Sequence, residues 1–150
     1  MAVTTYWFGE AAYGLVSATA ARRFDWVNDT IKVALTTSTW AVDQDTMNFY
    51  DDVTNELGTA TGYTAGGATL TSPALTYDTG SNTVRMDGAD VSWTFTASKT
   101  MRYAPVYKDT GTPATSPLIG YVDFGSDQTS SGVFTIQWDA TDGVFRMVVS

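Results

Sequence analysis

The feature that most constrains the fold is a succession of short β-prone segments separated by turn residues. Each segment is rich in Val, Ile, Thr, Tyr, Phe or Trp, and Gly, Pro, Asn, Asp or Ser separates it from the next. Six of them follow residue 67: ATLTSPALTYD, NTVRMDGADVSWTFT, TMRYAPVYKD, PLIGYVDFG, GVFTIQWD and GVFRMVVS. A seventh, residues 31–35, begins the run IKVALTTS. No crossover helix separates them, so the sequence predicts a mostly β protein, an antiparallel β-sandwich or barrel of about seven strands.

Alternation of side chains along two of these segments predicts which face is buried. Large apolar residues alternate with Ser, Thr or Gln, as expected for a strand with one face on the core. The predicted core positions are Val91, Trp93, Phe95, Phe134, Ile136 and Trp138.

The N-terminal part of the chain has a different pattern. It is rich in alanine, and Phe8, Ala11 and Leu15 recur at helical spacing, which predicts a short helix. We find no repeat or linker further on, so we expect two parts: an N-terminal helical appendage, residues 1–28, and a single β-domain, residues 29–150.

The stretch GYTAGGATL, residues 62–70, raises the question of a phosphate-binding loop. Gly62 and Gly67 have P-loop spacing, but Ala68 stands where the lysine is needed. A dinucleotide-binding fingerprint is also absent, and the residues that follow favour extended chain rather than a helix. We therefore expect a turn or bulge that leads into a strand.

Composition narrows the chemistry. The chain contains neither histidine nor cysteine, which removes Ser-His and Cys-His catalysis and thiolate metal sites. Carboxylate pairs such as Asp139 with Asp142, and Asp87 with Asp90, lie beside glycines and are typical of turns. We expect no enzymatic activity and no cofactor, and keep a carboxylate-based hydrolase only as a remote alternative.

The acidic stretch at residues 39–57 lacks a sustained period and is expected to be a long connection with a short helical turn. Counting twelve positions from Asp43 gives Asn48 where an EF-hand requires glycine and Thr54 where it requires glutamate, so we expect no metal there. A formal net charge of −8 disfavours nucleic acid and anionic membranes as partners. We expect a soluble protein made in the cytoplasm.

Aromatic residues outside the regular strands are the candidates for an interface. The Tyr6-Trp7-Phe8 triplet is too apolar to remain in water, so it either covers the protein's own β-domain or docks on another chain. In the second case nearby arginines would pair with carboxylates of the partner. The candidate interface residues are Tyr6, Trp7, Phe8, Tyr13, Arg22, Arg23, Trp26 and Trp40.

Four segments together resemble a family of short virion structural proteins of tailed bacteriophages, especially those of actinobacteria. They read NDTIKVALTTS, DDVTNELGTATGYTAGGATL, VYKDTGTPATSPLIGYVDFG and FTIQWDATDGVFRM, and the likeness covers nearly the whole chain beyond residue 28. The resemblance implies a capsid decoration, or cement, protein. Such a protein binds the major capsid protein on the capsid exterior, often as a homo-oligomer such as a trimer.

An alternative of another class remains open. The same β-domain could belong to the tail or host-contact apparatus and bind glycans or another virion protein. In that case Trp40 and Tyr63 would be stacking platforms for sugar rings. The sequence alone does not decide between head and tail.

Overall fold

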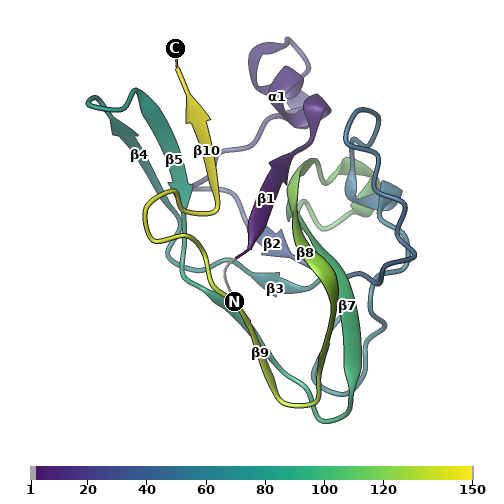
Figure 1. Ribbon diagram of the computed structural model, residues 1–150. Helices are drawn as coiled ribbons and strands as arrows, with labels where there is room; N and C mark the ends of the chain where they lie inside the picture. The colour runs from purple at the N-terminus through teal and green to yellow at the C-terminus, as the bar shows by residue number, and fades with distance from the viewer. Residues whose placement is uncertain (1–2, 150) are drawn as a thin grey trace.

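The computed structural model of the protein describes residues 3–149, which form three antiparallel sheets and one α-helix (Figure 1). The mostly β, sandwich-like fold predicted from the sequence is therefore confirmed. The described residues form ten strands instead of about seven. One reason is that NTVRMDGADVSWTFT makes two strands, because Gly88 and the residues beside it interrupt it. Short strands also form at Thr4–Trp7 and Ala68–Thr69.

The largest sheet has five strands in the order β1-β8-β7-β2-β3. Its strands are β1 (Thr4–Trp7), β2 (Ile31–Val33), β3 (Ala68–Thr69), β7 (Lys99–Lys108) and β8 (Leu118–Ser130). The antiparallel pair β7 and β8 is the longest element of the fold, and its register shifts between Met101 and Tyr103.

Two smaller sheets complete the fold. One has the order β10-β5-β4, with β4 (Ala74–Asp78), β5 (Thr83–Asp87) and β10 (Phe145–Val148). In Figure 1 these three strands lie together near the C-terminus, away from the β7–β8 ribbon. The other sheet pairs β6 (Val91–Thr94) with β9 (Val133–Ile136).

The main core lies between the sheets, and all six residues predicted for it are buried. Trp93 lies opposite Phe134 in the β6–β9 pair, with ring centroids 6.3 Å apart. The indole of Trp138 donates a hydrogen bond to the carbonyl of Ala89 at 3.0 Å, which satisfies its one polar group.

A second core lies on the other face of the five-stranded sheet. Ala34, Tyr107 and Leu118 belong to it, together with Phe8 and Trp40. The connection between β2 and β3 covers this face and includes the short 3₁₀ helix η2 (Tyr50–Asp52), as expected from the sequence. Both faces of the sheet are therefore covered, which explains why its strands carry apolar residues at consecutive positions.

The N-terminal segment belongs partly to the large sheet. β1 pairs with β8, and helix α1 (Gly9–Val16) follows it directly. The expected helix is present but brief, and its buried positions are Ala11 and Gly14, whereas Val16 is exposed. Gly14 lies against Arg22 of the 3₁₀ helix η1 (Ala20–Arg22), where a Cβ would come within 2.7 Å of the Arg22 Cβ. The division into residues 1–28 and 29–150 stays a prediction.

Candidate protein-interaction surface

The sheet β10-β5-β4 has one apolar face. Directly opposite residues of antiparallel strands share a face, and here Leu75 lies opposite Met86, while Tyr77 and Met147 both lie opposite Val84. Alternation therefore collects these five side chains on the same side of the sheet.

Part of this apolar face is open to solvent. Leu75 is 52% exposed, Tyr77 55% and Met147 37%. Beside them is a groove of about 350 Å³ that is also lined by Leu15 of α1 and by Trp26. Exposed apolar area of this kind marks sites of protein contact more often than a scattered surface leucine does. We call this surface, formed by Leu75, Tyr77, Val84, Met86 and Met147, the apolar face.

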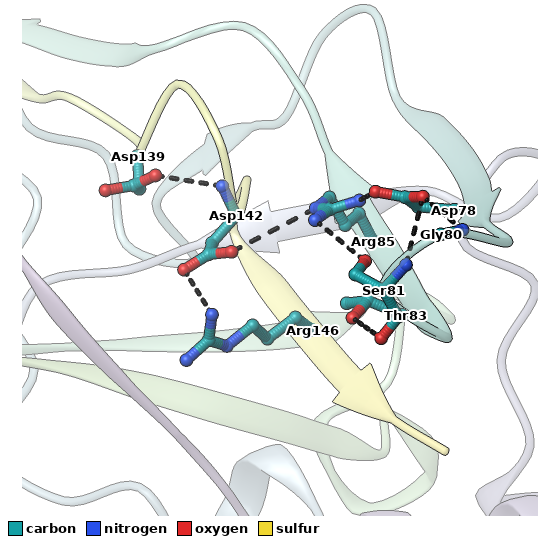
Figure 2. Close-up of polar contacts among 8 residues, drawn as sticks. All are labelled: Asp78, Gly80, Ser81, Thr83, Arg85, Asp139, Asp142 and Arg146. Atoms are coloured by element: carbon teal, nitrogen blue, oxygen red, sulfur yellow. Dashed lines mark hydrogen bonds and ion pairs between the residues drawn. The ribbon is translucent and has the colours of Figure 1, made fainter. Parts of the chain in front are cut away.

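The opposite face of the same sheet is polar and is occupied by ion pairs (Figure 2). Arg85 Nη1 lies 3.0 Å from Asp78 Oδ2, its Nε lies 4.0 Å from Asp142 Oδ1, and Arg146 Nη1 lies 2.6 Å from Asp142 Oδ2. Arg85 and Arg146 are direct cross-strand partners, so Asp142 between them offsets their repulsion. These charges pair with one another within the chain, although Arg85 Nε, 4.0 Å from Asp142, forms no hydrogen bond.

The pKa of Asp78 reflects this arrangement. The Arg85 guanidinium lowers it to about 2, aided by hydrogen bonds from Ser81 and from the Gly80 backbone N–H. Asp78 is therefore ionised and paired at neutral pH.

Three of the expected interface residues are enclosed by the protein itself. Phe8, Trp26 and Trp40 are buried, Trp26 at the lining of the groove beside the apolar face, and an interface role for them stays a prediction. Trp26 donates its indole N–H to the carbonyl of Asp87 at 2.8 Å, and the Trp40 ring packs edge-on against Tyr103. Their position outside regular strands suggested exposure, but the long connections fold back over the sheet and cover them. Tyr63 is also buried, so neither Trp40 nor Tyr63 can serve as a stacking platform for sugars.

Three more expected residues lie in different surroundings. Tyr6 is 39% exposed and stacks on Tyr121 with centroids 5.2 Å apart, whereas Tyr13 is exposed on α1. Trp7 is half-buried, and its indole N–H donates to the carbonyl of Arg146 at 3.2 Å, which links β1 to β10.

The two arginines near the helix bind within the chain. Arg22 forms an ion pair with Glu10, in the first turn of α1. Arg23 donates to the carbonyl of Ser17, the residue that caps the helix C-terminus, as expected for a cation at that negative pole. None of the contacts given for Arg22 and Arg23 joins them to the apolar face. An interface role for the two arginines stays a prediction.

The glycine-rich stretch forms a turn that enters β3, as the sequence predicts. Gly62, Gly66 and Gly67 all have positive φ angles, which side-chain-bearing residues rarely adopt. Glu56 anchors the turn: its Oε1 accepts hydrogen bonds from Tyr63 Oη at 2.7 Å and from the Gly66 N–H at 2.6 Å. The backbone N–H of Gly66 is therefore bonded to a carboxylate of the same chain, whereas the backbone N–H groups of a P-loop bind phosphate.

Tyr63 also supports the sheet. Its Oη accepts a hydrogen bond from the buried N–H of Leu35 at 2.9 Å. Burial, with the nearby Glu56 carboxylate as the second cause, raises the pKa of Tyr63 far above its ordinary value, so the phenol stays protonated.

The carboxylates considered as catalytic pairs are engaged by groups of their own chain. Asp139 Oδ1 accepts the N–H groups of Thr141 and Asp142, each at 2.8 Å, and these bonds lower its pKa. Asp90 accepts the N–H of Trp138 at 3.0 Å. In the acidic stretch, Asp43 likewise caps a turn by accepting from Thr46. Within residues 3–149 no group of three or more potential metal-ligating side chains comes together.

Comparisons with protein-family models, curated proteins and solved structures found no match. Along residues 3–149 no helix has the length and apolar character needed to cross a bilayer.

The apolar face is the best candidate site from the geometry, and sequence reasoning missed it. The available signal was the pairing of Leu75 and Tyr77 with Val84 and Met86 across the TGSN turn.

Proposed function

We propose that the protein is a non-enzymatic structural component of a bacteriophage virion. It binds the outside of the capsid and stabilises the lattice of the major capsid protein. The observation that carries the proposal is the apolar face, where Leu75, Tyr77 and Met147 are exposed on one side of the same sheet. The resemblance of the sequence to phage virion structural proteins is the reason for proposing the major capsid protein as the partner.

The chemistry of the remaining surface supports a binding role. Of the paired carboxylates considered from the sequence, Asp139 caps a turn, Asp142 forms an ion pair and Asp90 accepts a backbone N–H, so all three are engaged in structure. Binding to the assembled lattice and not to its free subunits would stabilise the shell by mass action. An acidic chain suits an exterior position, because its net charge favours solubility.

The test uses virions of the phage that encodes the chain. Shells that lack the protein are mixed with wild type, with Met147→Asp or with the control Val133→Asp, which adds the same charge at an exposed site on β9. We expect wild type and Val133→Asp to bind the outer surface and raise the temperature of shell disruption. Met147→Asp should bind at least tenfold more weakly, since it places a charge on the apolar face.

Three outcomes would contradict the proposal. The protein could be missing from purified virions, it could map to the tail in a cryo-EM reconstruction, or Met147→Asp could bind the shell as well as Val133→Asp. Localisation to the tail would favour the alternative of a recognition module.

A further inference from the structure

The edge of the three-stranded sheet suggests a second kind of contact. β4 pairs with β5 on one side and, in the part of the chain described, with no strand on the other. Four of its five residues, Ala74 to Tyr77, are exposed, so half of its backbone N–H and C=O groups are available to another strand.

Within residues 74–78 this edge lacks three of the features that block edge-to-edge pairing. Natural edge strands carry lysine, proline or a bulge, whereas β4 reads ALTYD and its register with β5 is unbroken over all five residues. Its one charged residue, Asp78, is already paired with Arg85 of its own chain. We infer that β4 pairs antiparallel with β4 of a second copy, which joins two three-stranded sheets into one of six strands.

The sequence of β4 selects one register. A two-fold axis perpendicular to the sheet requires opposite residues to share a face, and only the register centred on Thr76 pairs all five positions. Pro73 and the positive φ of Ser72 prevent the strand from extending backward, so shifted registers pair fewer residues.

The chosen register is self-complementary. Leu75 of each copy lies opposite Tyr77 of the other, which makes two aliphatic–aromatic pairs on the apolar side, and the two Thr76 side chains meet on the polar side. The two apolar faces then lie on the same side of the joined sheet. A chain with net charge −8 can approach itself here because residues 74–77 are uncharged. The contact uses the strand edge and covers part of Leu75 and Tyr77, whereas Met147, on β10 at the other edge of the sheet, stays open to a different partner.

The first measurement is the mass in solution without any capsid. Sedimentation equilibrium of wild type should give twice the 16.1 kDa of one chain. Leu75→Lys/Tyr77→Lys places lysine opposite lysine and should give the single-chain mass. The control Val133→Lys/Val148→Lys adds the same charge at exposed sites on β9 and β10 and should keep the dimer. Circular dichroism verifies that each variant is folded.

A single thiol tests the register independently. The chain has no cysteine, so Thr76→Cys introduces one, and opposite Cα atoms of an antiparallel pair are about 4.5–5.5 Å apart, within disulfide range. Mild oxidation should cross-link Thr76→Cys and leave Ser131→Cys, in the β8–β9 turn, uncross-linked. Two results would overturn the inference: a wild type that is monomeric at every soluble concentration, or an oligomer that survives the lysine substitutions and is not cross-linked through Thr76→Cys. Either result leaves the capsid test with Met147→Asp unaffected.

Discussion

Removal of one hydroxyl, by Tyr63→Phe, should destabilise the protein strongly. Tyr63 Oη accepts the buried N–H of Leu35 and donates to Glu56, so the variant leaves one buried donor unpaired and removes one hydrogen bond to a charged group. An unpaired buried donor costs about 1–3 kcal/mol, and a hydrogen bond to a charged group contributes about 1.5–3 kcal/mol. The phenyl ring remains, so no large cavity forms.

The two terms are coupled through the same oxygen, so we expect their joint effect to be about 2–4 kcal/mol, below their full sum. For a chain of this size the loss corresponds to a decrease in Tm of roughly 4–16 °C. The matched control is Tyr77→Phe, because its hydroxyl bonds to Asn82 at the exposed end of a hairpin, and its loss should change stability by less than about 0.5 kcal/mol.

Urea unfolding followed by tryptophan fluorescence measures both variants against wild type. A shift in midpoint at constant m-value would assign the change to stability. Glu56→Gln provides a further comparison, since the amide oxygen can still accept from Tyr63 and Gly66 but carries no charge, and its loss should be smaller than that of Tyr63→Phe. If Tyr63→Phe unfolds at the same urea concentration as Tyr77→Phe, the glycine-rich turn is not anchored as described.

Two further predictions concern the core and the ion pairs. Trp93→Ala should cost about 3–5 kcal/mol, since the ring is buried opposite Phe134, and wild-type thermal stability would contradict this. The pKa of Asp78 is lowered from 3.8 to about 2, so its stabilising effect is complete above pH about 4 and is lost as the pH falls toward 2. Asp78→Asn should flatten the dependence of the urea midpoint on pH in that window, and an unchanged slope would show that other carboxylates dominate.

The parts of the fold that sequence reasoning predicted are those with a local signal. Val91, Trp93 and Phe95 alternate with polar residues within five positions, and that period alone identifies the buried side of β6. The glycine-rich turn was predicted for a similar reason, because both the lysine missing from a P-loop and the extended-chain preference of the next residues are visible without knowing the fold.

The buried aromatics outside regular strands had no such signal. Trp26 meets Asp87, 61 positions away, and Trp40 meets Tyr103 and Tyr121. Such contacts depend on which connecting segments fold over which sheet. Neither the secondary-structure propensities of residues nor their spacing in the sequence predicts this. β1 was missed because four residues, TTYW, are too short to alternate convincingly.

The apolar face illustrates the same limit and also shows what the surface can do. Met86 and Leu75 are opposite residues of similar character, but Met86 belongs to the buried core with Trp26 and Phe145 whereas half of Leu75 is in water. The buried residue therefore contributes to folding, and the exposed one contributes little until a partner covers it. Substitution of Met147, which lies away from the inferred β4 contact, should accordingly alter capsid binding with little change in the free energy of unfolding. That separation makes the face accessible to experiment, because a loss of binding at an unchanged urea midpoint is not a loss of fold.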